Sequence, residues 1–269
     1  MKILERLDRR VLGAVRFVDV TTRLPVHAPL NVRAGVVEIE DTPRGYRMTG
    51  GVPIRSTPRG YYVLERAPGL EDFEAALAKD AFAAPPDEPA VGAVAVTLTV
   101  VDDRERRYLP RRWTVRLPRD TDRDSSESLF QAVEVAMFPS PAARTSPGWA
   151  VLRASLVDNA TSAPLPGALL LVRRASDGTT LGRGLSDDRG EALVSIAGIP
   201  VTTWGEGAGP VLATRVDATL AVAANPGAPK PPDPDDLEGR LDGFRAQPDT
   251  IALGSGVDQA ISIRVAPAP

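Results

Sequence analysis

The chain of 269 residues contains no cysteine and a single histidine, His27. Without cysteine the chain has no disulfide bonds, thiolate metal ligands or thiol nucleophiles, and one histidine is too few for a histidine-based zinc site. A Ser-His-Asp triad would need His27 as its base, but His27 lies in a predicted turn between Pro25 and Pro29, and no Gly-x-Ser-x-Gly motif accompanies it. The sequence therefore predicts a protein that is not an enzyme and carries no cofactor.

Long hydrophobic runs are also missing. No run approaches the length that spans a membrane, and the charged start, Met1–Arg10, lacks the apolar core of a secretory signal. These features predict that the chain is made in the cytoplasm without a signal peptide and does not insert into a membrane. The mature protein is expected to be either free or part of a particle. The net charge of −3, from 32 basic and 35 acidic residues, gives no global field that favours nucleic acid. The expected partners are other protein subunits, and the oligomeric state is left open.

Proline and glycine, by contrast, are abundant. The 26 prolines and 23 glycines lie mostly between short runs of alternating apolar and polar residues, which is typical of an all-β protein with many turns. In the run 113–117, for example, Trp113, Val115 and Leu117 share one face of a predicted strand, as a half-buried antiparallel strand requires. The strands predicted in the first half cover residues 11–20, 30–39, 61–65, 93–101, 113–117 and 131–137.

The two halves of the chain repeat one another. Phe17–Val26 and Leu156–Leu165 both read apolar-Val-Asp-x-x-Thr-x-x-Pro-apolar, at a shift of 139 (156 minus 17). Ser56–Gly60 matches Ser186–Gly190 at a shift of 130 (186 minus 56). Matches in the same order, with spacing that drifts only through loop lengths, indicate two copies of one fold.

A third pair of segments closes both copies. Residues 131–141 match residues 259–269 at a shift of 128, and both end in Pro-x-Pro. The chain is therefore predicted to be all-β, with two tandem Ig-like or transthyretin-like antiparallel β-sandwiches related by internal duplication. The expected domains are a first sandwich at 1–141, with an N-terminal segment and a short inserted helix at 71–84, a proline-rich linker at 142–148, and a second sandwich at 149–269.

One segment of the second copy cannot be a central strand. Asn225–Asp236 contains five prolines, which donate no backbone hydrogen bonds to a sheet. We interpret it as a long loop that is either a solvated excursion or a surface ordered by a partner.

One pattern of strands and turns in the second copy lies in Ala154–Asp158, Ala163–Ala168, Leu170–Val172 and Ser186–Ala192. In this pattern the second copy resembles the carboxypeptidase regulatory-like and transthyretin-like β-sandwich family, whose members are mostly non-catalytic accessory, stalk or binding modules. The first copy keeps only the turn skeleton of this pattern. The whole chain is also similar to small proteins encoded beside phage-tail-like contractile assemblies, through Tyr108–Arg112 and Phe138–Pro141. These resemblances imply a structural protein of a contractile injection system.

Two acidic clusters have some features of calcium sites. Asp120–Ser125 begins with aspartate at alternate positions, as a calcium-binding loop does. Its sixth position is serine instead of glycine, however, which favours a solvated loop. Asp158 together with Asp187 and Asp188 could hold calcium between sandwich loops, although turn capping is the simpler interpretation.

An arginine-rich stretch, Arg104–Arg119, is the most prominent candidate partner-binding surface. Arginines on the outer face of a strand suit carboxylates or phosphates by bidentate contact, but a solvated sheet face and a polyanion site stay open. The alternative function is a carbohydrate- or calcium-binding module in which Trp149 and Trp204 stack on sugar. The candidate partner-binding residues are Arg107, Arg111, Arg112, Arg116 and Trp204.

Overall fold

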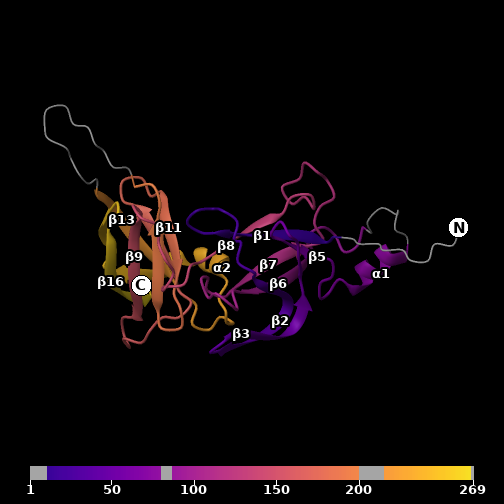
Figure 1. The fold of residues 1–269 in the computed structure, drawn as a ribbon, viewed down its shortest axis with the longest axis horizontal. Coiled ribbons are helices and arrows are strands. Elements are labelled where there is room, and N and C mark those ends of the chain that lie inside the picture. Colours follow the sequence, from indigo (N-terminus) through magenta and orange to yellow (C-terminus); the bar gives the residue numbers. More distant parts are fainter. Residues whose placement is uncertain (1–10, 80–86, 200–214, 268–269) are drawn as a thin grey trace. The chain divides into compact units, whose positions relative to one another are not determined.

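The computed structural model describes residues 11–79, 87–199 and 215–267, and their strands form four four-stranded sheets (Figure 1). The first sandwich combines a sheet of order β4-β5-β1-β8 with one of order β3-β2-β6-β7. The N-terminal segment 1–10 lies outside the described residues. The strands of the first sandwich are β1 (Gly13–Asp19), β2 (Asn31–Thr42), β3 (Gly45–Pro53), β4 (Arg55–Ser56), β5 (Tyr61–Leu64), β6 (Val94–Val101), β7 (Arg111–Leu117) and β8 (Val133–Met137).

The second sandwich combines a sheet of order β12-β9-β16-β14 with one of order β11-β10-β13-β15. Its pairs are antiparallel except for β16 and β9, which run parallel. Its strands are β9 (Ala150–Asp158), β10 (Leu169–Arg174), β11 (Thr180–Leu185), β12 (Glu191–Ile196), β13 (Arg215–Ala223), β14 (Phe244–Gln247), β15 (Thr250–Gly254) and β16 (Asp258–Pro267).

Strand order confirms the predicted fold class and its duplication. The order β5-β1-β8 in the first sandwich is repeated as β12-β9-β16 in the second, and β3-β2-β6-β7 is repeated as β11-β10-β13-β15. The matched sequence segments fall on equivalent strands, since they lie at the ends of β1 and β9, before β5 and β12, and on β8 and β16. The two copies therefore share a seven-stranded topology, to which the first adds β4 beside β5 and the second adds β14 beside β16.

The turns after β1 and β9 are the same in atomic detail. The Asp19 carboxylate accepts hydrogen bonds from the backbone N–H of Thr21 and Thr22, both at 2.9 Å, and from the Thr22 hydroxyl. The Asp158 carboxylate accepts from the N–H of Ala160 at 3.0 Å and from the N–H and hydroxyl of Thr161. Aspartate favours such turns because its short side chain reaches the backbone two or three residues ahead. The repeated Asp-x-x-Thr motif therefore stabilises the same turn in both copies.

A second turn, before β5 and β12, is also repeated. Gly60 and Gly190 adopt φ of 77° and 78°, and each donates its N–H to the carbonyl oxygen of the residue three positions back. A left-handed φ favours glycine because a side chain would crowd the backbone there. This requirement explains why both copies carry glycine at this place.

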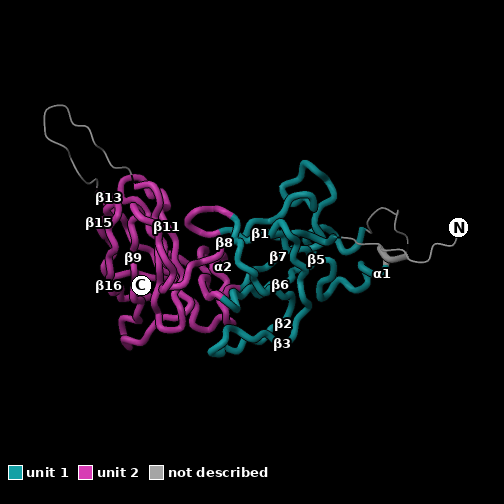
Figure 2. The backbone as a smooth tube through the Cα atoms, in the orientation of Figure 1, with its two compact units in different colours: residues 1–18, 25–104, 112–135 teal, residues 19–24, 105–111, 136–269 magenta. Residues whose placement is uncertain are grey.

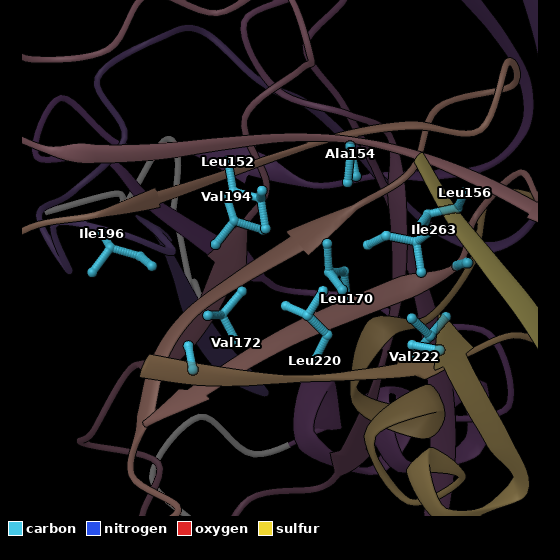
Figure 3. Packing of buried hydrophobic residues seen from close by; sticks show 14 of the residues in the cluster. Leu152, Ala154, Leu156, Leu170, Val172, Val194, Ile196, Leu220, Val222 and Ile263 are labelled. Carbon is cyan, nitrogen blue, oxygen red and sulfur yellow. The ribbon is translucent and has the colours of Figure 1, made fainter. Parts of the chain in front are cut away.

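The cores consist mainly of aliphatic side chains. In the second sandwich the inward-facing residues of the two sheets interdigitate (Figure 3), and they include Leu152, Leu170, Val194 and Leu220. In the first sandwich Phe17 packs edge-on against Tyr62, with ring centroids 5.0 Å apart. Burial raises the pKa of the Tyr62 hydroxyl, which exchanges hydrogen bonds with the backbone of Leu30.

The predicted inserted helix is α1 (Glu71–Lys79), which begins with the acidic residues that favour a helix N-terminus. All six strands predicted in the first half are present, but β3 and the two-residue β4 were missed. The sequence of β3 contains Gly50 and Gly51, both at positive φ, and the alternating pattern is interrupted there.

By compactness the chain divides into two units (Figure 2). Unit 1 comprises residues 1–18, 25–104 and 112–135, and unit 2 comprises residues 19–24, 105–111 and 136–269. Unit 2 is thus the second sandwich together with residues 19–24, 105–111 and 136–149, the last of which include the end of β8. The domain limits expected from the sequence, with a linker at 142–148, stay a prediction.

Candidate interaction surfaces

Arg111 has no exposed surface, unlike the partner-binding residue expected from the sequence. In unit 2 its guanidinium contacts Asp235 at 3.0 Å and Asp233 at 3.5 Å, and it donates a hydrogen bond to the carbonyl oxygen of Ala136. The same group lies 5.9 Å from the ring centroid of Phe138, within cation–π range. Arg111 is therefore engaged inside the molecule and is not accessible to a partner.

Asp233 links this arginine to a short helix. The helix α2 (Pro234–Glu238) begins after Asp233, whose carboxylate accepts a hydrogen bond from the N–H of Asp235. Burial raises the pKa of the Asp233 carboxyl above its ordinary value and outweighs the opposing attraction of Arg111. The pair is therefore a partly desolvated ion pair.

The proline-rich loop around α2 is ordered by its own domain, which corrects the expectation of a solvated or partner-ordered loop. A 3₁₀ turn, Leu241–Gly243, follows α2. The side chains of Leu237 and Leu241 are buried against Leu169 and Leu171 on the outer face of β10. Leu109 and Phe138 belong to the same apolar cluster. The second unit thus has a core inside the sandwich and a second apolar layer outside the β10 sheet.

The other predicted arginines differ from one another in exposure. Arg107 is exposed, with its guanidinium 3.6 Å from Glu105, and Arg116 is exposed on β7. Arg112 is half-buried, and Trp204 lies outside the described residues. The part of the predicted surface that a partner can reach in the described residues is therefore Arg107 and Arg116, which belong to different units.

The acidic clusters cap turns. The Asp187 carboxylate accepts hydrogen bonds from the N–H of Arg189 and Glu191, and the Asp120 carboxylate accepts from the N–H of Asp122 at 2.9 Å. The N–H of Thr161 lowers the pKa of the Asp158 carboxyl, and the N–H of Asp122 does the same for Asp120. In the described ranges no three metal-ligating side chains gather into a site, and His27 is exposed.

An open groove lies beside α2 in unit 2. It has a volume of about 450 Å3 and is lined by the half-buried Phe244 together with polar side chains of Asn225, Arg240 and Asp242. The Arg240 guanidinium is held by Asp236 at 3.3 Å. An aromatic ring beside hydrogen-bonding groups suits a small polar ligand such as a sugar.

The two lateral sides of the second sandwich are built differently. On one side β11 and β12 approach closely, since a Cβ added at Gly184 would lie 2.7 Å from the carbonyl oxygen of Leu193, and one at Gly182 would lie 2.6 Å from Val194. On the other side β14 covers only residues 264–267 of β16, and among the described strands residues 258–263 pair with β9 alone. One side is closed by backbone packing, and on the other side six residues of the β16 edge pair with no described strand.

No family model and no curated protein matches the chain. Among solved structures, the chain is similar to the minor pilin GBS52 of Streptococcus agalactiae, at 8% identity, 96% coverage of this chain, 98% of that chain and a TM-score of 0.24. It is also similar to a mutant of the shaft pilin SpaA of Lactobacillus rhamnosus GG, at 10% identity, 96% and 98% coverage and a TM-score of 0.21.

The resemblance to the carboxypeptidase regulatory-like family has no matching family model and stays a prediction. Among the described residues, no helix has both the length and the apolar character needed to cross a membrane.

Proposed function

We propose that the protein is a non-enzymatic structural component of a larger protein assembly, of the phage-tail-like contractile injection type. The chain is made in the cytoplasm and is incorporated into the particle through contacts with other protein subunits. Its role is to present strand edges and loops to those neighbours.

The unpaired edge of β16 is the observation that carries this proposal. Six residues of this ten-residue strand have one row of backbone donors and acceptors without a neighbouring strand among the described residues. Such an edge is a template for pairing with another chain. In contrast, the charged groups of Asp158, Asp187 and Arg111 form hydrogen bonds and ion pairs within the protein itself.

The contractile type of assembly is supported by the resemblance of two short segments, and these segments are neighbours in unit 2. Leu109 donates its N–H to the carbonyl oxygen of Phe138 at 2.8 Å, and Ser140 donates to that of Arg107 at 2.7 Å. Residues 108–111 and 138–141 therefore lie side by side in unit 2, with Leu109 and Phe138 buried in the apolar layer outside β10.

The proposal is tested by co-expression with the sheath and tube proteins encoded by adjacent genes. We expect a complex of fixed stoichiometry in size-exclusion chromatography, and the chain in purified particles by mass spectrometry. A chain that binds none of these proteins and is missing from the particles would contradict the proposal.

A carbohydrate-binding module is the second candidate, and the groove at Phe244 favours it. An aromatic ring flanked by Asn225 and Asp242 offers stacking and hydrogen bonds to a sugar. Glycan-array binding that is lost on Phe244→Ala or Trp204→Ala would support this function, and a protein that binds no glycan would not have it.

A further inference from the structure

The unpaired edge of β16 has properties that favour a second copy of this chain as its occupant. Between Asp258 and Arg264 the edge is uncharged, with the sequence Gln259-Ala260-Ile261-Ser262-Ile263. It has no proline and contains two β-branched isoleucines, which favour strand pairing. Natural proteins usually protect such an edge with a charge, a proline or a bulge.

The pairing of β14 with β16 shows the strand direction that this edge accepts. β14 pairs antiparallel with the last part of β16, with Ala246 opposite Val265 and Gln247 opposite Arg264. Ala246 is buried in the core of the sandwich, whereas Gln247 is exposed on the outer face. A further antiparallel strand can therefore continue this sheet along residues 258–263.

The first copy shows how the same edge is protected. The shift of 128 between the closing strands places Glu134 of β8 at the position of Ser262 in β16 (262 minus 128). A carboxylate on an edge strand opposes pairing with another chain. The second copy has a small neutral side chain at this place, and Ser262 is exposed.

We propose that two copies of the chain associate through their β16 edges, antiparallel about a two-fold axis at Ala260. In this register Asp258 lies opposite Ser262 of the second copy, Gln259 lies opposite Ile261, and Ala260 faces itself. No like charges oppose one another, and every contact occurs twice, as a two-fold interface requires. Ile261, which is half-buried at the rim of the core, is covered by the second copy.

Charges near the edge fit this register. The only charged side chain of the segment, Asp258, is already paired with Arg153 of β9, whose guanidinium lies 3.2 Å away. Arg264 lies beyond the free segment, opposite Gln247 of β14. The proposed pairing therefore leaves both charged groups on the exposed face of the sheet. The inference rests on the proposed structural role and names a second copy as one partner.

Sedimentation velocity of the full chain over a range of concentrations tests the proposal. We expect a monomer–dimer equilibrium that Ser262→Glu weakens about tenfold or more, because the new carboxylate faces Asp258 of the second copy twice. Ser262→Lys adds a charge at the same place but faces Asp258 with an ammonium group, so the dimer should be at least as tight as in the wild type.

Ala252→Glu is the matched control, since it adds a carboxylate to β15, the exposed edge of the other sheet, and should leave the dimer unchanged. Thermal unfolding confirms that each variant folds. A dimer that survives Ser262→Glu, is lost with Ala252→Glu or is lost with Ser262→Lys would overturn the proposal. A chain that stays monomeric but binds sheath or tube proteins would overturn the dimer and leave the proposed function standing.

Discussion

The closing strands of the two copies, β8 and β16, occupy the same place in the topology but differ along their outer edges. Val135 and Met137 of β8 are buried like Ile263 and Val265 of β16, so both strands contribute the same face to a core. β8 begins only at Val133, however, and carries Glu134, whereas β16 begins at Asp258. Two copies of one fold can therefore differ in what they offer a partner through a few edge residues.

The segment beside each closing strand differs in the same way. In the second copy Phe244 pairs with Pro267 in the ladder between β14 and β16, and in the first copy Tyr108 pairs with Pro139 through an isolated bridge. Pro110 donates no hydrogen bond, so the ladder does not continue there. Instead the side chain of Arg111 donates to Ala136. A side chain in one copy thus replaces part of a backbone ladder in the other.

The largest effect is expected at the repeated glycine turn, where the two copies can be compared directly. Gly60→Ala should cost about 1 kcal/mol, because only the left-handed backbone is strained and no atom lies within 4 Å of the added methyl group. Gly190→Ala should cost about 3 kcal/mol, because its methyl group would also lie 2.6 Å from the carbonyl oxygen of Leu156. Urea denaturation measures both values, and equal losses would contradict this account of the turn.

An intermediate effect is expected on removal of the buried cation. Arg111→Met should lower the free energy of unfolding at pH 7 by about 2 kcal/mol, less than for a fully buried pair, because Asp235 is half exposed. Arg107→Met is the control and should change stability by less than about 0.5 kcal/mol, since that arginine is exposed.

The pH dependence of this variant has a definite sign. The pKa of Asp233 is raised in the folded protein, so its contribution to stability is greatest below the ordinary value near 4 and is lost as the pH rises through the raised pKa. Without Arg111 the pKa rises further, and the stability deficit of the variant should shrink on acidification. A deficit that is constant between pH 7 and pH 4 would contradict this account of the pair.

The smallest effect is expected at the aspartate turn. Hydrogen bonds from Thr161 lower the pKa of Asp158, so its stabilising contribution is present above the ordinary pKa and is lost as the pH falls through the lowered value. Asp158→Asn should therefore destabilise the protein slightly at pH 7 and make no difference at the acid end. Thermal unfolding at both pH values checks this, and a loss that persists in acid would indicate another cause.

Much of the fold could be predicted from the sequence because its signals are local. The Asp-x-x-Thr and glycine turns repeat as short motifs, and alternation is visible in Val115 and Leu117, which are buried beside the exposed Thr114 and Arg116. The burial of Arg111 also had a signal that was overlooked. Its position has the same parity as Trp113, Val115 and Leu117, which places it on the inward face of β7.

The order in the α2 loop could not be predicted from the loop alone. Its prolines indicate only that it is not a central strand, and its burial depends on Leu237 and Leu241 meeting a distant strand. A signal lay in β10, where Leu169–Val172 are apolar on consecutive positions. Such a run is typical of a strand buried on both faces, so some other segment must cover the outer face. The unpaired edge of β16 could not be predicted from the sequence either, because tertiary pairing sets the strand order.

Hydrogen–deuterium exchange of the closing strands tests the difference between the two copies most directly. The backbone amides of β16 within residues 258–263 are measured in dilute and in concentrated protein, alongside those of β8 within residues 133–135. The account predicts protection that rises with concentration in β16 and stays constant in β8. Exchange in β16 that is the same at every concentration would contradict it.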